Sequence, residues 1–293
     1  MQLLEQNLNS HYDSHDETKS FENFTQKVNS MRKKFEVLCI EATFCHLETA
    51  NGLNIDFNFW RCCFHRLIET LRKEYNSLKS SDRNQELFKM IGNVLKEYID
   101  DGMRFYADFV EKLENKYLKF NTQDLVDLNL TNNVESIQKS FLINMTMRSK
   151  NMKLALMFIN RCWISQGDLA RYEELIFATS SVNLSPSQNI TQRDYSIART
   201  FYLKAKCIAP KSSRAYHQLA IIAVYTKRRL DACYYYFRCL QVNQPLTSVR
   251  QALNSIFDEA RIRSDAILKF IQAAIVNKQK RKTMADNKNE SNY

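Results

Sequence analysis

Glycine and proline are scarce in this chain, which has only 4 Gly and 3 Pro among its 293 residues. Average proteins contain about 7% Gly and about 5% Pro. Because tight hairpins and sheet bulges depend on these residues far more than helices do, their scarcity argues against an all-β fold. Hydrophobic residues make up 44% of the sequence, which is typical of globular rather than disordered chains. The composition therefore predicts long helices joined by few turns.

The sequence also lacks the patterns of metal sites, disulfide frameworks and membrane helices. Its 8 cysteines are scattered, and neither a CxxC motif nor a zinc-type spacing of Cys and His occurs. No apolar run approaches the ~20 residues of a membrane span. The N-terminus shows no basic-then-apolar signal. We therefore expect reduced thiols, no cofactor, no metal and a cytoplasmic protein, with shuttling to the nucleus left open.

Catalytic motifs are missing as well: there is no Walker loop, no GxSxG and no HExxH. The expectation is a protein that is not an enzyme. The formal net charge of +10 permits a nucleic-acid or phosphate partner. Part of this charge lies in the C-terminal tail, where a solubilising end and a nucleic-acid contact are equally open readings.

Apolar residues recur at spacings of three and four through most of the chain, which is typical of amphipathic helices. The expected helices cover residues 20–48, 56–78, 82–117, 152–177, 194–207, 212–225, 230–241 and 248–276. The first has an apolar stripe of Phe21, Phe24, Val28, Met31, Phe35, Leu38 and Ala42. We expect Asn51-Gly52 to end it, with Gly52 in a left-handed cap. Gly92 and Gly102 mark either a close helix crossing or a break.

These helices are expected to form a single domain over residues 19–276. Within it, the polar and poorly periodic residues 121–150 are interpreted as an insertion loop. Residues 1–18 and the basic tail 277–293 are expected to be disordered.

An internal repeat is the strongest pattern in the sequence. Ala198, Tyr202 and Ala205 are followed 34 residues later by Ala232, Tyr236 and Cys239. This is the period of the tetratricopeptide repeat, and the small-aromatic-small spacing is that of its second helix. Pro210 and Pro245 follow as helix-ending prolines, the second one residue out of step. The alternative is a helical bundle with a chance coincidence. Since two repeats are too few for a solenoid, the upstream helices must complete the array.

Three segments form a recognisable combination: Gly167-Asp168-Leu169-Ala170-Arg171-Tyr172, then Ala215-Tyr216-His217-Gln218-Leu219-Ala220 after Ala209-Pro210, and Asp231-Ala232-Cys233-Tyr234-Tyr235-Tyr236-Phe237-Arg238-Cys239-Leu240. Together they resemble the family of the Est-one and the Smg-five, Smg-six and Smg-seven proteins. The match covers residues 163–261, and before them only Phe59-Trp60-Arg61 fits, loosely. The resemblance implies an all-α, 14-3-3-like antiparallel helical array with tetratricopeptide-type helix hairpins.

The same resemblance implies a non-enzymatic adaptor of nonsense-mediated mRNA decay, most similar to the Smg-five/Smg-seven branch. Such an adaptor binds phosphoserine or phosphothreonine peptides of the decay RNA helicase and forms a heterodimer with a related 14-3-3-like protein. The aromatic run from Tyr234 to Phe237 is a candidate pairing surface, although it could be wholly intramolecular. Two alternatives remain open: an Est-one-like subunit that binds telomerase RNA, and a dimerisation module with a degraded phosphate pocket.

The candidate phosphopeptide site follows from the resemblance. Arg171 matches the family's phosphate-binding arginine, with Tyr172 beside it, although a salt bridge from Arg171 to Asp168 is an alternative. The family's second cation is a lysine five residues after a tryptophan, and counting from Trp60 that position holds His65. Neighbouring cations and a second histidine complete the candidate set, namely Arg61, Arg66 and His217. Arg61 shares a helix face with His65 and could supply the missing charge.

Overall fold

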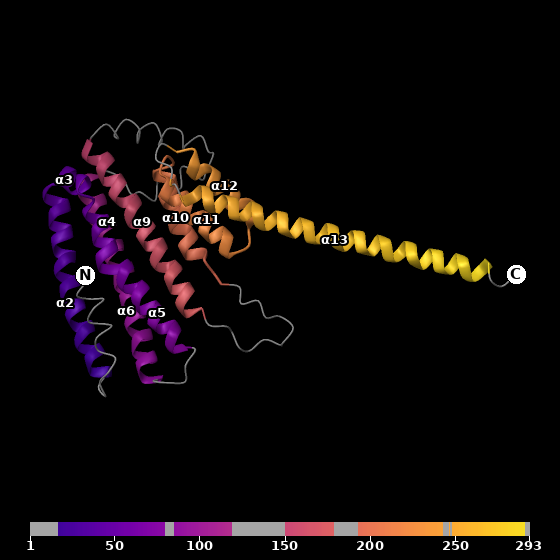
Figure 1. Ribbon diagram of the computed structural model, residues 1–293. Coiled ribbons are helices and arrows are strands. Elements are labelled where there is room, and N and C mark those ends of the chain that lie inside the picture. Colours follow the sequence, from indigo (N-terminus) through magenta and orange to yellow (C-terminus); the bar gives the residue numbers. More distant parts are fainter. Residues whose placement is uncertain are drawn as a thin grey trace. The chain divides into compact units, whose positions relative to one another are not determined.

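A computed structural model of the chain describes residues 17–79, 85–118, 150–178, 193–242, 246 and 248–290. Every regular element in these ranges is a helix and no strand occurs in them, which confirms the all-α prediction. The chain divides into two compact units, Met1–Lys211 and Ser212–Tyr293 (Figure 1). Each unit is described by itself, and the single domain over residues 19–276 stays a prediction. Most of the predicted disordered N-terminus and of the insertion at 121–150 lies outside the described residues.

The first unit is a set of helices, most of which lie side by side (Figure 1). In chain order they are α2 (Glu17–Cys45), α3 (Leu47–Gly52), α4 (Ile55–Trp60), the π-helical turn η1 (Arg61–His65), α5 (Arg66–Lys79), α6 (Gln85–Tyr117), α9 (Lys150–Phe177) and α10 (Ser196–Ile208). None of the helices in the described ranges is long and apolar enough to cross a membrane.

Helix α9 is the centre of the first unit. It packs against α6 on one side and α10 on another, and every residue from Cys162 to Ala170 is buried. A helix that is buried all round must lie between other helices. At Gly102 of α6, an added Cβ atom would come within 2.8 Å of the side chains of Leu169 and Phe64. Gly102 therefore marks a close helix crossing, one of the two readings that the sequence left open.

Helix α2 is rotated away from the orientation that its sequence predicts. Three residues of the predicted core stripe, Met31, Phe35 and Leu38, are exposed, while Arg32 and Thr43 are buried. The Arg32 side chain forms ion pairs with Glu36 and with Asp101 of α6. Because a buried guanidinium needs carboxylate partners, these ion pairs turn the Arg32 face of α2 inward.

The region from Cys45 to His65 differs in detail from the sequence prediction. Helix α2 ends at Cys45, and a short helix, α3, then runs to Gly52. In the described ranges no glycine has a positive φ, and Asn54 (φ 50°) takes the left-handed conformation expected of Gly52. Asn tolerates this conformation better than most side chains, so the turn forms two residues later than predicted. The helix predicted at 56–78 is continuous but contains the π-helical turn η1.

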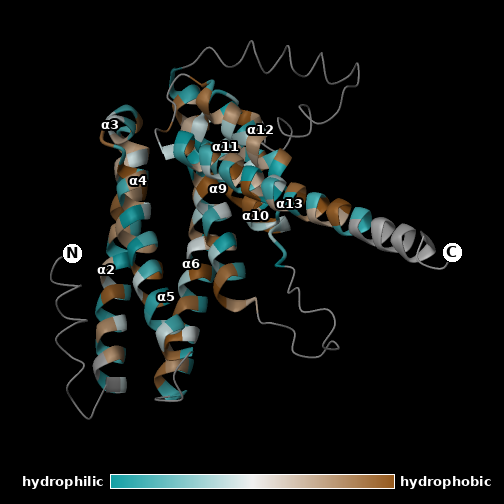
Figure 2. Ribbon diagram, turned by 45° about the vertical axis from the view of Figure 1, so that its right-hand side comes forward, coloured by the Kyte–Doolittle hydropathy of each residue, from teal (hydrophilic) through white to brown (hydrophobic). Residues whose placement is uncertain are grey.

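The second unit contains α11 (Ser213–Tyr225), α12 (Arg229–Leu240) and α13 (Ser248–Glu290). Its core cluster consists of Tyr216, Ala220, Tyr236, Cys239, Val249 and Leu253. Helix α13 continues past position 276, where the sequence predicted a disordered tail, and it is exposed from Phe257 to Gln279. No Gly or Pro follows Pro245, so nothing in the sequence breaks the helix. Figure 2 shows hydrophobic segments along this exposed helix.

The repeated residues occupy similar positions in their two units. Ala198, Tyr202 and Ala205 of α10 are buried against α9, and their counterparts in α12 are buried against α11. In each hairpin the buried tyrosine lies near a small residue of the preceding helix, Gly167 in the first and Ala220 in the second. This agreement favours the predicted equivalence of the two helix hairpins. That the two hairpins superpose stays a prediction. Pro245 lies outside the described residues.

Candidate functional site

Arg171 lies on α9 near its C-terminal end and is 11% exposed. One of its terminal nitrogens donates to Oδ1 of Asp168 at 3.2 Å, and its Nε donates to the Tyr202 hydroxyl at 3.4 Å. The guanidinium also lies over the ring of Tyr172, 4.8 Å from its centroid. The internal salt bridge to Asp168 that the sequence offered as an alternative is therefore present.

The residues before Arg171 explain why its side chain is held in this position. A Cβ atom on Gly167 would come within 2.4 Å of the Tyr202 ring, so only glycine lets this ring approach α9. The Tyr202 hydroxyl then donates to Asp168 Oδ1 at 2.7 Å. The segment from Gly167 to Tyr172 thus acts as a unit: the glycine admits the tyrosine ring, and the aspartate accepts hydrogen bonds from both Tyr202 and Arg171.

Arg171 remains a cation with spare hydrogen-bonding capacity. Burial alone would lower its pKa, but the negative Asp168 and the Tyr202 hydroxyl outweigh burial, so the pKa of Arg171 is raised. Within the described residues only two of its five N–H donors are engaged, at 3.2 and 3.4 Å. Good charge-assisted hydrogen bonds are about 2.7–2.9 Å long. An anionic ligand could therefore offer Arg171 better partners than it has here.

His65 and Tyr172 extend the site from α9 to η1. The exposed His65 ring lies 6.3 Å, between centroids, from the ring of Tyr172. The Tyr172 hydroxyl bonds to Glu69 of α5, which also accepts a hydrogen bond from Arg72 at 2.8 Å. Burial and this bond to Glu69 raise the pKa of Tyr172, so its hydroxyl stays protonated. π-Helical turns such as η1 are frequent at functional sites.

The other three candidate residues lie on η1, α5 and α11. Arg61 of η1 is exposed, and Arg66, the first residue of α5, is half-buried. His217 belongs to α11 of the second unit, where its ring lies 6.3 Å from that of Tyr236. Of the six predicted residues, Arg171, Tyr172 and His65 are linked by ring contacts, and the role of all six stays a prediction.

Lys96 is a cation beside the site that the sequence did not single out. It lies on α6 and forms ion pairs with Glu173 of α9 and with Asp100 at 3.3 Å. The hydrogen bond to Glu173 raises the pKa of Lys96. The spacing of Lys96 and Asp100 marks an exposed helix face, but the sequence does not indicate that this face meets α9.

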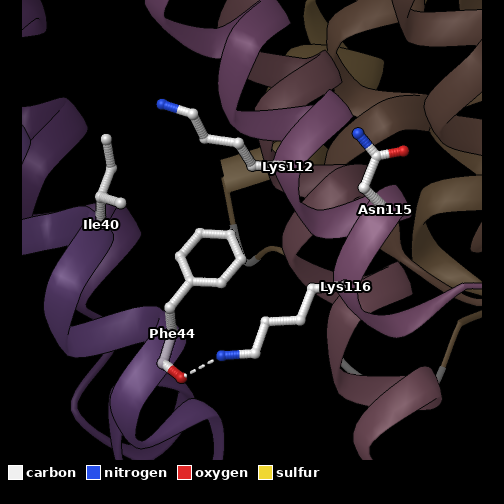
Figure 3. Close-up of a pocket in the computed structure, with 5 residues that line it drawn as sticks. All are labelled: Ile40, Phe44, Lys112, Asn115 and Lys116. Carbon is white, nitrogen blue, oxygen red and sulfur yellow. Dashed lines mark hydrogen bonds between the residues drawn. The ribbon is translucent and has the colours of Figure 1, made fainter.

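A shallow hollow lies elsewhere in the first unit, between α2 and α6 (Figure 3). It has a volume of about 460 Å³ and is lined by Ile40, Phe44, Lys112, Asn115 and Lys116. Lys116 Nζ donates to the Phe44 carbonyl oxygen at 2.7 Å. Lys116 and Lys96 are ~30 Å apart along α6, at 1.5 Å per residue, so the hollow is separate from the Arg171 site. Among the described residues no group of three metal-binding side chains occurs.

Comparison with known proteins adds two family matches. The family described as "Telomerase activating protein Est1" matches residues 54–176, and the "Est1 DNA/RNA binding domain" matches residues 198–286. The first match contains His65, Arg171 and Tyr172; the second contains the repeated tyrosines Tyr202 and Tyr236.

Three individual proteins are also similar in sequence to this chain. Telomerase-binding protein EST1A of Danio rerio is 32% identical over 242 residues, which is 83% of this chain and 14% of that protein. Nonsense-mediated mRNA decay factor SMG7 of Arabidopsis thaliana is 27% identical over 250 residues, 79% of this chain and 21% of that protein. Nonsense-mediated mRNA decay factor SMG5 of Danio rerio is 24% identical over 232 residues, 79% of this chain and 19% of that protein.

The chain therefore spans between 14% and 21% of the length of these three relatives. They include a telomerase-binding protein as well as decay factors, so the narrower assignment to the Smg-five/Smg-seven branch stays a prediction. On the combined matches, the chain belongs to the Est1/Smg5/Smg7 family.

Proposed function

We propose that this chain is a non-enzymatic, cytoplasmic adaptor of nonsense-mediated mRNA decay that binds phosphoserine or phosphothreonine peptides of the decay RNA helicase. The observation that carries the proposal is the Arg171 site, a nearly buried cation with unused donors, bordered by Tyr172 and His65. The relatives named as decay factors SMG5 and SMG7 support the choice of process.

The chemistry of the site suits a phosphate monoester. A phosphorylated side chain carries a charge of about −1.5 to −2 at neutral pH and offers three acceptor oxygens. Arg171 would donate to two of them through its planar guanidinium, with Asp168 and Tyr202 holding the guanidinium in place. The exposed His65, whose ring contacts that of Tyr172, would donate a further hydrogen bond to the phosphate. The Glu69 carboxylate nearby opposes an anion, but its hydrogen bond from Arg72 reduces that repulsion.

Pairing with a related 14-3-3-like protein is the second part of the proposal. In the aromatic run of α12, Tyr236 is buried, whereas Tyr234 and Phe237 are 57% and 48% exposed. One helix face cannot bury the whole run, so part of it is available to a partner. Large exposed aromatic side chains are enriched where proteins associate.

The phosphopeptide proposal is tested by titrating a phosphorylated peptide and its unphosphorylated form against four proteins: wild type, Arg171→Glu, His65→Ala and Lys153→Glu. Arg171→Glu should cost about 2–4 kcal/mol of binding free energy, because it removes a charge-assisted contact and adds repulsion. His65→Ala, at an exposed position, should weaken binding about three- to tenfold, the effect of about 1 kcal/mol.

Lys153→Glu changes the charge equally at an exposed position on the same helix and is the matched control, expected to bind like wild type. Circular dichroism must show that each variant is folded. Equal affinity for both peptides in wild type would mean that the pocket does not read phosphate and that the domain acts by pairing alone.

RNA binding is a second candidate, favoured by the match of residues 198–286 to a DNA/RNA binding domain. The net charge of +10 and the exposed Arg261 and Arg263 of α13 support it. Neutralising phosphates releases counterions, so the logarithm of the affinity should fall steeply and linearly with the logarithm of the salt concentration. Fluorescence anisotropy with a single-stranded RNA at several salt concentrations measures this slope. A flat dependence would argue against an RNA contact.

A further inference from the structure

Helix α12 presents a row of charged and aromatic side chains on its outer side, here called the α12 row. It consists of Lys227 and Arg228 at the N-terminal end of the helix, followed by Asp231, Tyr234 and Arg238. Tyr234 is 57% exposed, and Arg238 is half-buried. Because Asp231, Tyr234 and Arg238 recur at spacings of three and four, they lie on one side of the helix.

Another side of α12 packs against α13. The side chain of Arg229 forms an ion pair with Glu259 of α13 at 2.8 Å, and the ring of Phe237 lies 6.5 Å, between centroids, from the ring of Phe257. Tyr236 belongs to the core cluster of the second unit. The α12 row therefore lies on a different side of the helix from the contacts with α13 and from the core.

Arg238 is a cation without a counter-charge. Within the described residues its guanidinium has no carboxylate partner. One terminal nitrogen donates to the hydroxyl of Tyr216 at 3.3 Å, and the guanidinium lies 5.4 Å from the centroid of the Tyr216 ring. Because Tyr216 is buried, this contact holds the guanidinium in place. A planar guanidinium that is held in this way and has unused terminal donors is suited to binding a phosphate group.

The rest of the α12 row is positively charged as well. Lys227 and Arg228 are exposed, and the one acid of the row, Asp231, forms an ion pair with Arg228. The row thus has three cations against one carboxylate, and Tyr234 lies between them. From Arg228 to Arg238 it is about 15 Å long at 1.5 Å per residue. Cations that alternate with an exposed aromatic ring are typical of surfaces that bind single-stranded nucleic acid.

We propose that the α12 row binds single-stranded RNA, with an unpaired base stacked on Tyr234 and a neighbouring phosphate held by Arg238. The proposal rests on RNA binding, the second candidate function of this chain, and adds the place and the class of RNA. Residues 198–286, which match the DNA/RNA binding domain, include the whole row. In a duplex the bases already stack on one another, so no base face would be free for Tyr234.

Fluorescence anisotropy of the whole chain with a labelled single-stranded RNA, over a series of salt concentrations, tests the proposal. Wild type should bind the single strand more tightly than the duplex that this strand forms with its complement. Tyr234→Ala should weaken binding of the single strand about fivefold or more, because it removes one stacked base. Phe237→Ala removes an exposed ring on the α13 side of the same helix and is the matched control, expected to bind like wild type.

The salt dependence separates the role of Arg238 from that of Tyr234. Each phosphate contact with a single strand adds about 0.7 to the steepness with which the logarithm of the affinity falls with the logarithm of the salt concentration. Arg238→Gln should therefore weaken binding and make the slope shallower by about 0.7, whereas Tyr234→Ala should leave the slope unchanged. Lys153→Gln, which removes a charge at an exposed position of the first unit, is the control and should change neither affinity nor slope.

The proposal would be overturned, with RNA binding intact, if wild type bound RNA with a steep salt dependence and both Tyr234→Ala and Arg238→Gln bound like wild type. Equal affinity for the single strand and the duplex would equally reject it. No RNA binding by wild type would instead remove the RNA function itself, and this inference with it.

Weaker pairing of Tyr234→Ala with a related 14-3-3-like protein, at unchanged RNA affinity, would assign the α12 row to a protein partner and reject the RNA contact. Circular dichroism must show that Arg238→Gln is folded. Because Tyr234 is exposed, Tyr234→Ala keeps the test decisive even if Arg238→Gln does not fold.

Discussion

At the scale of single residues, the absence of a side chain at Gly167 determines the geometry around Arg171. The ring of Tyr202 occupies the space that a Cβ atom would need, and its hydroxyl thereby reaches Asp168. The family motif around Gly167 can thus be explained by contacts within one pair of helices. Arg171 takes its position from these contacts and not from an ordinary surface ion pair.

Gly167→Ala should destabilise the first unit by about 1–3 kcal/mol, because overpacking forces Tyr202 off α9. Urea denaturation followed by circular dichroism measures the change. Gly52→Ala is the matched control: a Cβ atom there would meet nothing within 4 Å, so the midpoint should not fall. If Gly167→Ala were as stable as wild type, the close approach of Tyr202 would not be required by the fold.

At the scale of secondary-structure elements, α2 has one apolar face and one mixed face, and the structure decides which of them enters the core. The sequence predicts the face with Met31, Phe35 and Leu38, because it contains the larger side chains. The structure instead buries the face with Arg32, whose guanidinium forms ion pairs with Glu36 and Asp101 and lies 5.0 Å from the ring centroid of Tyr98. The partner Asp101 is on another helix, so no pattern within α2 could reveal it.

Arg32→Met should destabilise the chain by about 3–5 kcal/mol, although methionine is the more hydrophobic residue. The reason is that it leaves the partly buried Glu36 and Asp101 without their shared cation. Lys33→Met, at the exposed neighbouring position, should change stability by less than about 0.5 kcal/mol. Chemical denaturation of both variants makes the comparison, and equal midpoints would show that the Arg32 ion pairs do not hold α2 in place.

At the scale of the whole molecule, α13 differs from every other described helix because it is exposed from Phe257 to Gln279. Helices in water without tertiary contacts depend on intrinsic propensity and melt gradually. The helices of the first unit, by contrast, bury large side chains such as Tyr106, Phe109 and Phe158. During heating, the helical circular dichroism signal should therefore show a cooperative transition from the packed helices. It should also show a gradual, non-cooperative loss from the exposed part of α13.

A chain that ends at Val276 should show less of this gradual loss and keep the midpoint of the cooperative transition. The removed turns of α13 are helical but lie beyond the core cluster of the second unit. Circular dichroism at the helical minimum during heating provides the measurement. A drop in the midpoint on truncation would mean that the end of α13 stabilises a folded unit.

The sequence by itself determined the helical class, most helix positions and the repeated small-aromatic-small pattern. These follow from local periodicity and from the scarcity of Gly and Pro, which act over a few residues. The family resemblance read from the sequence also predicted Arg171, Tyr172 and His65 as members of a candidate phosphopeptide site. The structure then brought these three residues together.

Only the tertiary structure decided which face of α2 enters the core, where Lys96 lies and what Gly167 accommodates. Each of these depends on side chains from two helices that are distant in sequence, such as Arg32 with Asp101, Lys96 with Glu173 and Gly167 with Tyr202. Local patterns specify that a helix has an apolar side, but ion pairs and close contacts between helices select its rotation.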